Sequence, residues 1–580
     1  MRAVRMIENA RRRAVAGARA AGVIAVAALV ALGLSCGEKP KPTEPRIPRE
    51  VEVPEYLRDT VGEVARFSGR EGVPVQGFGF VTGLDGTGTK VVPPGIRQQI
   101  LDMMRRRKVS GAEEIVSSAD NAVVMVMGII PPGLAKGGVF DLEVRAIATT
   151  ETTSLEGGFL LECDLARVVS TRGVEAKSED LAYGRGGIFV SPFASGEKGK
   201  ETIDPRVGRI LAGGRSRKTR NFRLVLLAPS VRIVDQVVRL VNGRFPGAAK
   251  GSQDPSRVDL LVPAEYQDDN DHFLDLVGGI YLRESPDVRD QRVNVLVEAL
   301  KSGKDLDRVA ICLEAMGASV VPHLRPLATH SSEAVRFQVG RTLANLQDAQ
   351  SVSVLEQIAL KEGSEFQEMA VEALGRLHSG IGLGVLGRAV NAKSTRVRVA
   401  AWQAMTRISP RMFVAENFKD KFSLSLISTK AEPFVYVSRT LKPRIALFGD
   451  VTLRPPVVIE TRRVLATAQG DAKEMTLISR WHGKDYRVQS TLAARDLVEK
   501  LALPPVPPIE EGRPPPPEGP PQGLDLSYSD VVGLLYELSQ KKSLGAPLVL
   551  QPLTFRGGSR GLTSRPIGEK EEESPLSGEP

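Results

Sequence analysis

The sequence contains little cysteine and histidine, the residues that form disulfide frameworks and many metal sites. Among 580 residues there are three cysteines and five histidines. Cys163 and Cys312 lie in the apolar stretches FLLECDL and VAICLEAM. We expect two buried free thiols in separate domains, and a bridge between them is the alternative. The histidines have no metal-ligand spacing with cysteines or carboxylates, so the sequence predicts no metal site. They are His272, His323, His330, His378 and His482.

The chain has no broad excess of positive charge, although its net charge is +9. Residues 1–35 hold six arginines and one glutamate, which accounts for +5, so the other 545 residues carry only 9 − 5 = +4. Charge this dilute does not indicate a polyanionic partner, and we expect no binding of nucleic acid.

Long hydrophobic runs are also scarce. The run AAGVIAVAALVALGLS, residues 20–35, is short for a membrane-spanning helix but suits the apolar part of an export signal. Because a basic segment precedes it, we predict a signal peptide over residues 1–35. The following Cys36 resembles the lipidated cysteine of a bacterial lipoprotein, although Gly33 stands where leucine is usual; a conventional cleavage site nearby is the alternative. Residues 36–55, rich in proline and charge, suit a tether.

Residues 56–285 have a mixed pattern. Strand-like runs such as NAVVMVMGIIP and FDLEVRAIA are interrupted by Pro-Pro-Gly and Gly-Gly pairs, and VRIVDQVVRLVNGRF has helical spacing. Strands and helices that do not alternate strictly predict an α+β multidomain protein.

A helical pattern recurs between residues 286 and 412. The stretches VRFQVGRTLANL, FQEMAVEALGRL and VRVAAWQAMTRI begin 31 residues apart, at Val335, Phe366 and Val397, and the looser RVAICLEAMG precedes them. Helix pairs that cannot bury their apolar faces alone predict a short α-solenoid. It resembles the HEAT repeat family; an irregular helical bundle is the alternative.

Basic residues collect in the last of these repeats. They are a candidate docking face for an anionic envelope polymer or an acidic protein, and a solvated helical face is the alternative. The candidates are Arg388, Lys393, Arg396, Arg398, Arg407 and Arg411.

Strand signals return over residues 413–502. A proline-rich linker, residues 503–522, can join neither helix nor sheet. In residues 523–555 we expect a helix with Ser527 as its cap, and residues 556–580 are predicted to be disordered.

The stretch GFGFVTGLDGTGTK, residues 77–90, is rich in glycine but is not a phosphate-binding loop. Thr89 stands where such a loop needs lysine, and Lys90 comes one residue late. We therefore expect no nucleotide cofactor. Alternating apolar residues predict a strand with close backbone approach, followed by a turn at Asp85-Gly86.

The same stretch resembles the glycine-rich signature of the flagellar P-ring protein family. The resemblance continues through NAVVMVMGIIPPGLAKGGVFDLEVRAIATTETTSLEGGFLLECDL and RVGRILAGG, and returns past the repeats in RIALFGDVTLRPPVV. It covers residues 55–285 well, and residues 431–475 and 523–550 more thinly, so the repeats interrupt a P-ring-type core.

This resemblance implies a non-enzymatic structural protein. Identical copies would form a ring in the periplasm around the flagellar rod, next to the outer-membrane ring lipoprotein and peptidoglycan, and would act as a passive bushing in the basal body. By analogy, flat strands and glycine-rich backbone suit subunit packing. The ring-assembly candidates are Gly77, Gly79, Gly83, Gly86, Gly88, Pro131, Pro132, Gly157 and Gly158.

Two other classes stay open. Cys36 and the solenoid also fit a non-flagellar envelope lipoprotein that uses this fold as a scaffold. An exported enzyme is the third class. Its candidate carboxylate pairs, Asp268-Asp269 and Glu113-Glu114, lie in polar sequence typical of turns, where solvation is expected. The sequence shows no grouping of a nucleophile with a general base.

Overall fold

The computed structural model describes residues 54–551, except 107, 172–173, 193–203, 284, 379, 420, 482–483 and 506–521. The predicted signal peptide, Cys36, nearly all of the tether, His482, most of the proline-rich linker and the predicted disordered tail lie outside the described residues. The combination of several sheets with a helical segment confirms the α+β multidomain class.

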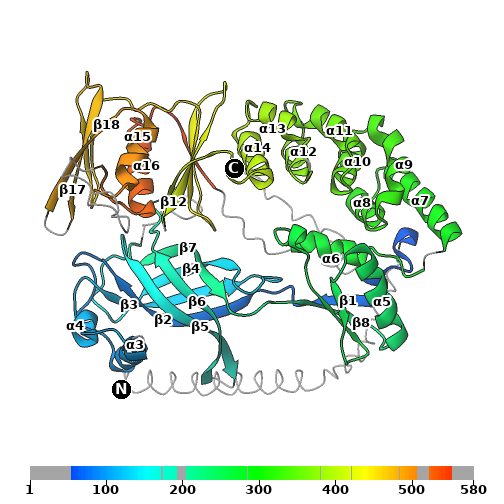
Figure 1. Cartoon of the computed structure of the whole chain (residues 1–580), viewed down its shortest axis with the longest axis horizontal. Coiled ribbons are helices and arrows are strands. Elements are labelled where there is room, and N and C mark those ends of the chain that lie inside the picture. The colour runs from blue at the N-terminus through cyan, green and yellow to red at the C-terminus, as the bar shows by residue number, and fades with distance from the viewer. Residues whose placement is uncertain are drawn as a thin grey trace, which may run out of the picture. The chain divides into compact units, whose positions relative to one another are not determined.

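Six antiparallel strands close into a barrel in the order β2-β3-β4-β7-β6-β5 (Figure 1). Burial alternates along them, as it must when one face points into a core; in β4, Phe140, Leu142 and Val144 are buried. The strands predicted at residues 121–131 and 140–148 are confirmed. The bounds are β2 Val73–Thr82, β3 Ala122–Ile130, β4 Val139–Ala146, β5 Phe159–Thr171, β6 Val174–Gly187 and β7 Val207–Ser216.

Two helices, α3 (Pro94–Arg106) and α4 (Ala112–Val116), connect β2 to β3. Their apolar faces share a small core of their own with Phe80 and Val123 of the barrel wall.

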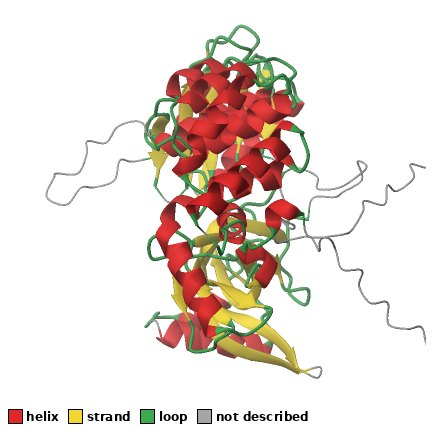
Figure 2. Ribbon diagram, turned by 90° about the vertical axis from the view of Figure 1, so that its right-hand side faces the viewer, coloured by secondary structure: helices red, strands yellow, loops and turns green. Residues whose placement is uncertain are grey.

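A second, four-stranded antiparallel sheet has the order β1-β8-β10-β9. The helices α5 and α6 share its core, and Figure 2 shows helices in front of the strands on this side of the molecule. In α5 the buried stripe is Val234, Val237 and Val241, which have the spacing of one helix face. The bounds are η1 Glu55–Leu57, α2 Val61–Val64, β1 Ala65–Ser68, β8 Phe222–Leu226, α5 Val231–Arg244, β9 Ala249–Gly251, β10 Arg257–Leu260, η2 Ala264–Tyr266 and α6 Asn270–Gly278.

The repeats form a stack of short helices, as the 31-residue period predicts. Leu343, Leu374 and Met405, which occupy the same repeat position, are all buried. The bounds are α7 Pro286–Lys301, α8 Leu306–Ala315, η3 Ala318–Val320, α9 Val321–Leu324, η4 Arg325–Thr329, α10 Glu333–Asn345, α11 Gln350–Ala359, α12 Gln367–Leu374, α13 Leu383–Ala389 and α14 Thr395–Ile408.

The C-terminal part contains two more sheets, with strand orders β11-β12-β14-β13-β19 and β15-β16-β17-β18. Ser527 caps α16 in a capping box with Asp530, which confirms the predicted cap. The bounds are β11 Val414–Phe418, β12 Phe422–Ile427, β13 Phe434–Val437, β14 Arg444–Phe448, β15 Val457–Glu460, β16 Leu465–Ala468, β17 Glu474–Trp481, β18 Lys484–Thr491, α15 Ala494–Ala502, α16 Tyr528–Gln540 and β19 Leu548–Leu550.

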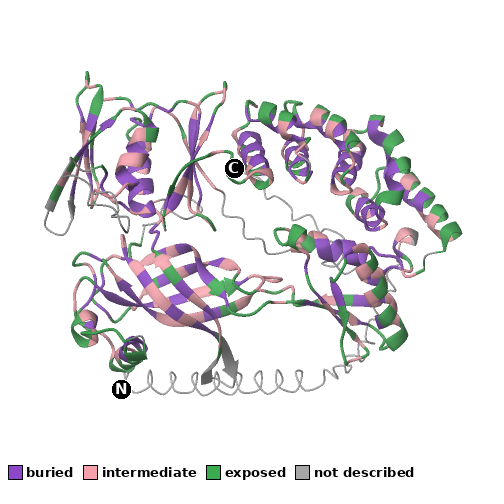
Figure 3. Ribbon diagram, in the orientation of Figure 1, coloured by how far each residue is buried: buried purple, intermediate pink, exposed green. Residues whose placement is uncertain are grey.

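The solenoid shares a hydrophobic core with a sheet at each end (Figure 3). Ile311 and Ala315 of α8 belong to the core of the β1-β8-β10-β9 sheet. Trp402 of α14 lies in one core with Phe434 and Phe448 of the five-stranded sheet. Terminal repeats need a cover for their apolar ends, and here the flanking sheets provide it. The solenoid is therefore continuous with its neighbours.

Polar side chains reinforce the first of these junctions. The His272 Nε2 and Glu314 Oε1 atoms are 2.7 Å apart, and Asn345 Nδ2 donates to Glu314 Oε2 at 2.8 Å. Burial pushes the pKa of Glu314 upward, but the charge of His272 and the hydrogen bonds outweigh it, so this pKa is lowered. One repeat later, Arg376 pairs with Asp269 at 2.7 Å. Both partners, His272 and Asp269, belong to α6 or its cap.

Both described cysteines are free and buried, which confirms the prediction for Cys163 and Cys312.

Candidate functional site

The glycine-rich stretch ends β2 and turns back over the barrel. Asp85 and Gly86 both have positive φ, 51° and 80°, which confirms the predicted turn. The Asp120 side chain fastens it, because Oδ1 accepts a hydrogen bond of 2.9 Å from the Gly86 N–H.

Three of its glycines are needed for packing within this chain. A Cβ added to Gly77 would lie 2.2 Å from the Asp164 carbonyl oxygen, and one on Gly88 would lie 2.0 Å from that of Asn121. A Cβ on Gly79 would meet the Leu160 side chain at 2.6 Å. The predicted close backbone approach is confirmed, and it occurs between neighbouring segments of the barrel domain.

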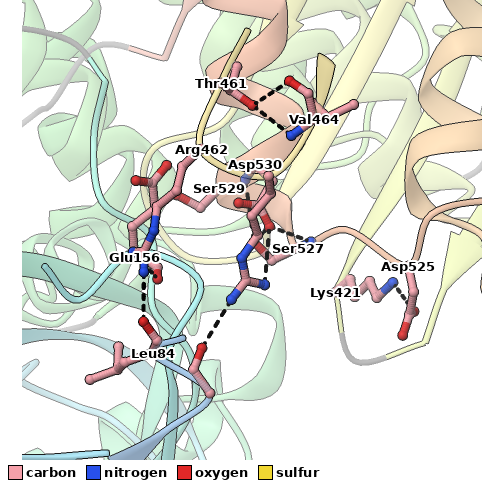
Figure 4. A network of polar contacts seen from close by, with 12 residues as sticks. Leu84, Glu156, Lys421, Thr461, Arg462, Val464, Asp525, Ser527, Ser529 and Asp530 are labelled. Carbon is pink, nitrogen blue, oxygen red and sulfur yellow. Dashed lines mark hydrogen bonds and ion pairs between the residues drawn. The ribbon is translucent and has the colours of Figure 1, made fainter. Parts of the chain in front are cut away.

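The turn also binds the side chain of Arg462, which lies in the loop between β15 and β16 (Figure 4). Arg462 Nη2 donates to the Leu84 carbonyl oxygen at 2.7 Å and to Thr87 Oγ1 at 3.2 Å. Its Nη1 donates to the Glu156 carbonyl oxygen at 3.4 Å. A charged donor thus binds carbonyl groups of the turn in addition to the hydrogen bonds that the turn makes with its own and neighbouring residues.

Arg463, the next residue, holds the same loop from a second side. Its Nη2 donates to the Gly83 carbonyl oxygen at 3.0 Å, and its Nη1 lies 4.0 Å from Asp530 Oδ2. A Cβ on Gly157 would lie 2.5 Å from the guanidinium carbon of Arg463. Gly157 also has a φ of 71°, so both space and backbone conformation favour glycine there. We call residues 83–87, 156–157, 462–463 and 530 the arginine clamp.

The clamp contains a half-buried carboxyl group, that of Glu156, and a buried one, that of Asp530. Burial and the nearby Asp530 raise the pKa of Glu156, and Arg462 and Arg463 offset only part of that effect. Asp530 is 4% exposed and accepts hydrogen bonds from the N–H and Oγ of Ser527. Two arginines therefore lie beside two carboxylates; of these four side chains Asp530 is buried, Glu156 and Arg463 are half-buried, and Arg462 is exposed.

Further contacts join the barrel to the same C-terminal part. Asp141 Oδ1 accepts hydrogen bonds from the N–H groups of Ala212, at 2.8 Å, and Leu441, at 2.9 Å. The rings of Phe189 and Tyr528 lie 5.5 Å apart. These contacts thus connect the barrel with segments that are distant in the sequence.

The remaining ring-assembly candidates also contact their own chain. A Cβ on Gly158 would meet Val81 at 2.6 Å and Leu84 at 2.7 Å. The Pro132 carbonyl oxygen accepts a hydrogen bond of 2.9 Å from Asn270 at the start of α6, and Pro131 precedes it in the same turn. Ring assembly through these residues stays a prediction.

The predicted docking face is wrong at Arg398. This side chain is 2% exposed, its Nη1 donates to the Glu432 carbonyl oxygen at 2.7 Å, and its guanidinium lies 4.6 Å from the centre of the Phe434 ring. Burial lowers its pKa. It lies on the face of α14 that packs on the five-stranded sheet, which the spacing of basic residues alone does not reveal. Arg388 pairs with Glu356 at 2.6 Å, whereas Arg396 and Arg407 are exposed.

Sequence reasoning missed Arg462, Arg463 and the bridging role of Asp141. The available signal was a pair of adjacent arginines in a short loop between two strands, ETRRVLATA. Within the described ranges, no cluster of His, Cys, Asp and Glu side chains could hold a metal ion. None of the helices among these residues is long and apolar enough to cross a membrane.

Comparison with known proteins gives two family matches. The family model described as "Flagellar P-ring protein" matches residues 60–317, and the one described as "HEAT repeats" matches residues 293–375. The first extends past residue 285, where the sequence suggested that the core is interrupted.

Individual relatives agree with the first match. A "Flagellar P-ring protein" of Thermotoga maritima is 30% identical over 241 residues, which is 39% of this chain and 67% of the relative. One of Caulobacter vibrioides is 28% identical over 224 residues, and this chain spans only 58% of its length. A solved complex of CpcE and CpcF of phycocyanin lyase from Nostoc sp. PCC7120 is 19% identical over 20% of this chain and 79% of that chain, with a TM-score of 0.19, which is too low to support an argument. The sequence resemblance is thus confirmed, and the chain belongs to the flagellar P-ring protein family, with HEAT repeats following its family core.

Proposed function

We propose that this chain is a structural subunit of the flagellar basal body P ring, and that identical copies assemble in the periplasm around the rod as a passive bushing. Family membership carries the proposal. A ring of identical subunits needs heterologous contacts whose rotation closes. Its expected neighbours are the rod, the ring lipoprotein of the outer membrane and peptidoglycan, and Cys36 would tether the chain to a membrane.

The arginine clamp supports a mechanical role. A bushing must keep its shape while a rod turns inside it, so its subunit needs firm connections between its parts. Arg462 and Arg463 bind the barrel's signature turn, and Asp141 adds a second attachment. We infer that the signature glycines give the turn the conformation that these arginines bind. A correctly folded subunit is then a condition for ring closure.

The test is electron microscopy of detergent-extracted envelope complexes, captured through a tag on this chain. Rings threaded on a rod are the expected result. An abundant chain that is never found with a rod would contradict the proposal and favour a non-flagellar envelope scaffold, a reading that the HEAT repeats also suit.

A tagged Gly83→Val or Gly86→Val chain separates assembly from folding. Neither glycine has a neighbour closer than 3.8 Å at its Cβ position, so the substitution acts mainly through the positive φ at the turn. We expect a folded chain with fewer rings. Normal ring numbers would argue against a part for this turn in assembly.

A further inference from the structure

The last part of the solenoid has an unusual distribution of charge. Residues 375–415 contain seven basic residues and no aspartate or glutamate. They are Arg376, Arg388, Lys393, Arg396, Arg398, Arg407 and Arg411. Any acidic partner of these residues must come from another segment.

Four of the seven are used inside the chain. Arg376 pairs with Asp269, Arg388 with Glu356, and Lys393 with Glu362, at 2.6–2.8 Å. Arg398 is buried between α14 and the five-stranded sheet. Arg376, Arg388 and Lys393 thus each bind a carboxylate from another segment of the chain.

The other three, Arg396, Arg407 and Arg411, are exposed and make no ion pair with the residues that the structure describes. Arg396 and Arg407 are eleven residues apart on α14, which is about three turns and roughly 16 Å along one face. Gln403, also exposed, lies between them on that face. Arg411 follows directly after the helix, and the next residue, Met412, is 50% exposed.

We propose that this surface, defined by Arg396, Gln403, Arg407, Arg411 and Met412, binds an acidic segment of a partner protein. Guanidinium groups match carboxylates in geometry, and arginine and methionine are enriched at protein interfaces. Arg376, one repeat before Arg407 at the same position, already binds a carboxylate in this way. The surface lies outside residues 60–317, the segment that matches the P-ring family model.

The test is the affinity of the full chain for a synthetic amphipathic helix of about 18 residues, long enough to cover the stripe, with glutamate on one face and leucine on the other. The triple variant Arg396→Gln, Arg407→Gln, Arg411→Gln is compared with a control triple, Arg232→Gln, Arg239→Gln, Lys250→Gln. The control residues are exposed on α5 and β9, so both triples remove the same charge.

We expect the first triple to weaken peptide binding about tenfold or more, and the control triple to change it less than about twofold. The loss should shrink as salt is raised, because the charges are exposed. Equal losses in both triples, or no loss in either, would overturn the proposal. Preferential binding of vesicles containing anionic phospholipid over the peptide would overturn the assignment to a protein partner. A single Arg407→Gln chain with an unchanged circular dichroism spectrum provides the same comparison if the triple is unstable.

Discussion

The most direct test of the arginine clamp is the substitution Gly157→Ala. The added Cβ would lie 2.5 Å from the Arg463 guanidinium carbon, and the backbone at Gly157 has a φ of 71°. Two costs are therefore expected. Left-handed backbone costs a non-glycine residue about 1 kcal/mol, and displacing a charged hydrogen bond to the Gly83 carbonyl costs roughly 1.5–3 kcal/mol more. The total destabilisation of the clamp is about 2.5–4 kcal/mol.

Gly137→Ala is the matched control. Its φ is 80°, and nothing lies within 4 Å of the Cβ position, so it should show only the backbone cost of about 1 kcal/mol. Hydrogen exchange measures the local opening free energy, at residues 83–87 and 156–157 for Gly157→Ala and at residues 137–138 for the control, and it avoids a two-state assumption for a chain of several domains.

A double-mutant cycle with Arg463→Ala isolates the contact between the two residues. In the Arg463→Ala background, Gly157→Ala should cost no more than the control substitution. A coupling energy near zero, or equal costs for Gly157→Ala and Gly137→Ala in the native background, would refute the reasoning.

Three further predictions concern charged groups that are half-buried or buried. Glu156→Gln should stabilise the chain at neutral pH, because the raised pKa of Glu156 means that its ionised form disfavours folding. This loss of folding stability is relieved as pH falls through the raised pKa towards the ordinary value of 4.5. A denaturation series against pH checks this, and a difference that does not shrink in acid would contradict it. Arg398→Ala should cost about 3–5 kcal/mol, because it leaves buried carbonyl acceptors without a donor. The control Arg396→Ala, at an exposed position, should cost less than about 0.5 kcal/mol. Similar melting temperatures for the two variants would contradict this prediction. His272→Ala should cost about 3–5 kcal/mol, because it leaves the buried Glu314 carboxylate without its ion-pair partner. Since the pKa of Glu314 is lowered, the stability that its carboxylate contributes is lost as pH falls through that pKa. An unchanged rate of proteolysis at the junction between α6 and the solenoid would contradict this prediction.

The sequence by itself determined the local structure and the family. Alternation of apolar residues predicts β3 and β4, the 31-residue period predicts the stacked helices, and Ser527 predicts the start of α16. These features depend on neighbours a few residues away or on a regular repeat, so they are visible in one dimension. The same is true of the turn at Asp85-Gly86, because its backbone conformation suits only a few residue types.

Only the tertiary structure decided which residues meet. Arg462 binds the Leu84 carbonyl oxygen across 378 residues of sequence, and no local pattern indicates that pairing. Arg398 and Arg396 look alike in the sequence, yet one is buried against a sheet and the other is exposed, because the direction of packing of α14 depends on the strands that follow it. The glycines of the signature were recognisable, but their purpose came from the arginines and carbonyl groups that the fold brings to them.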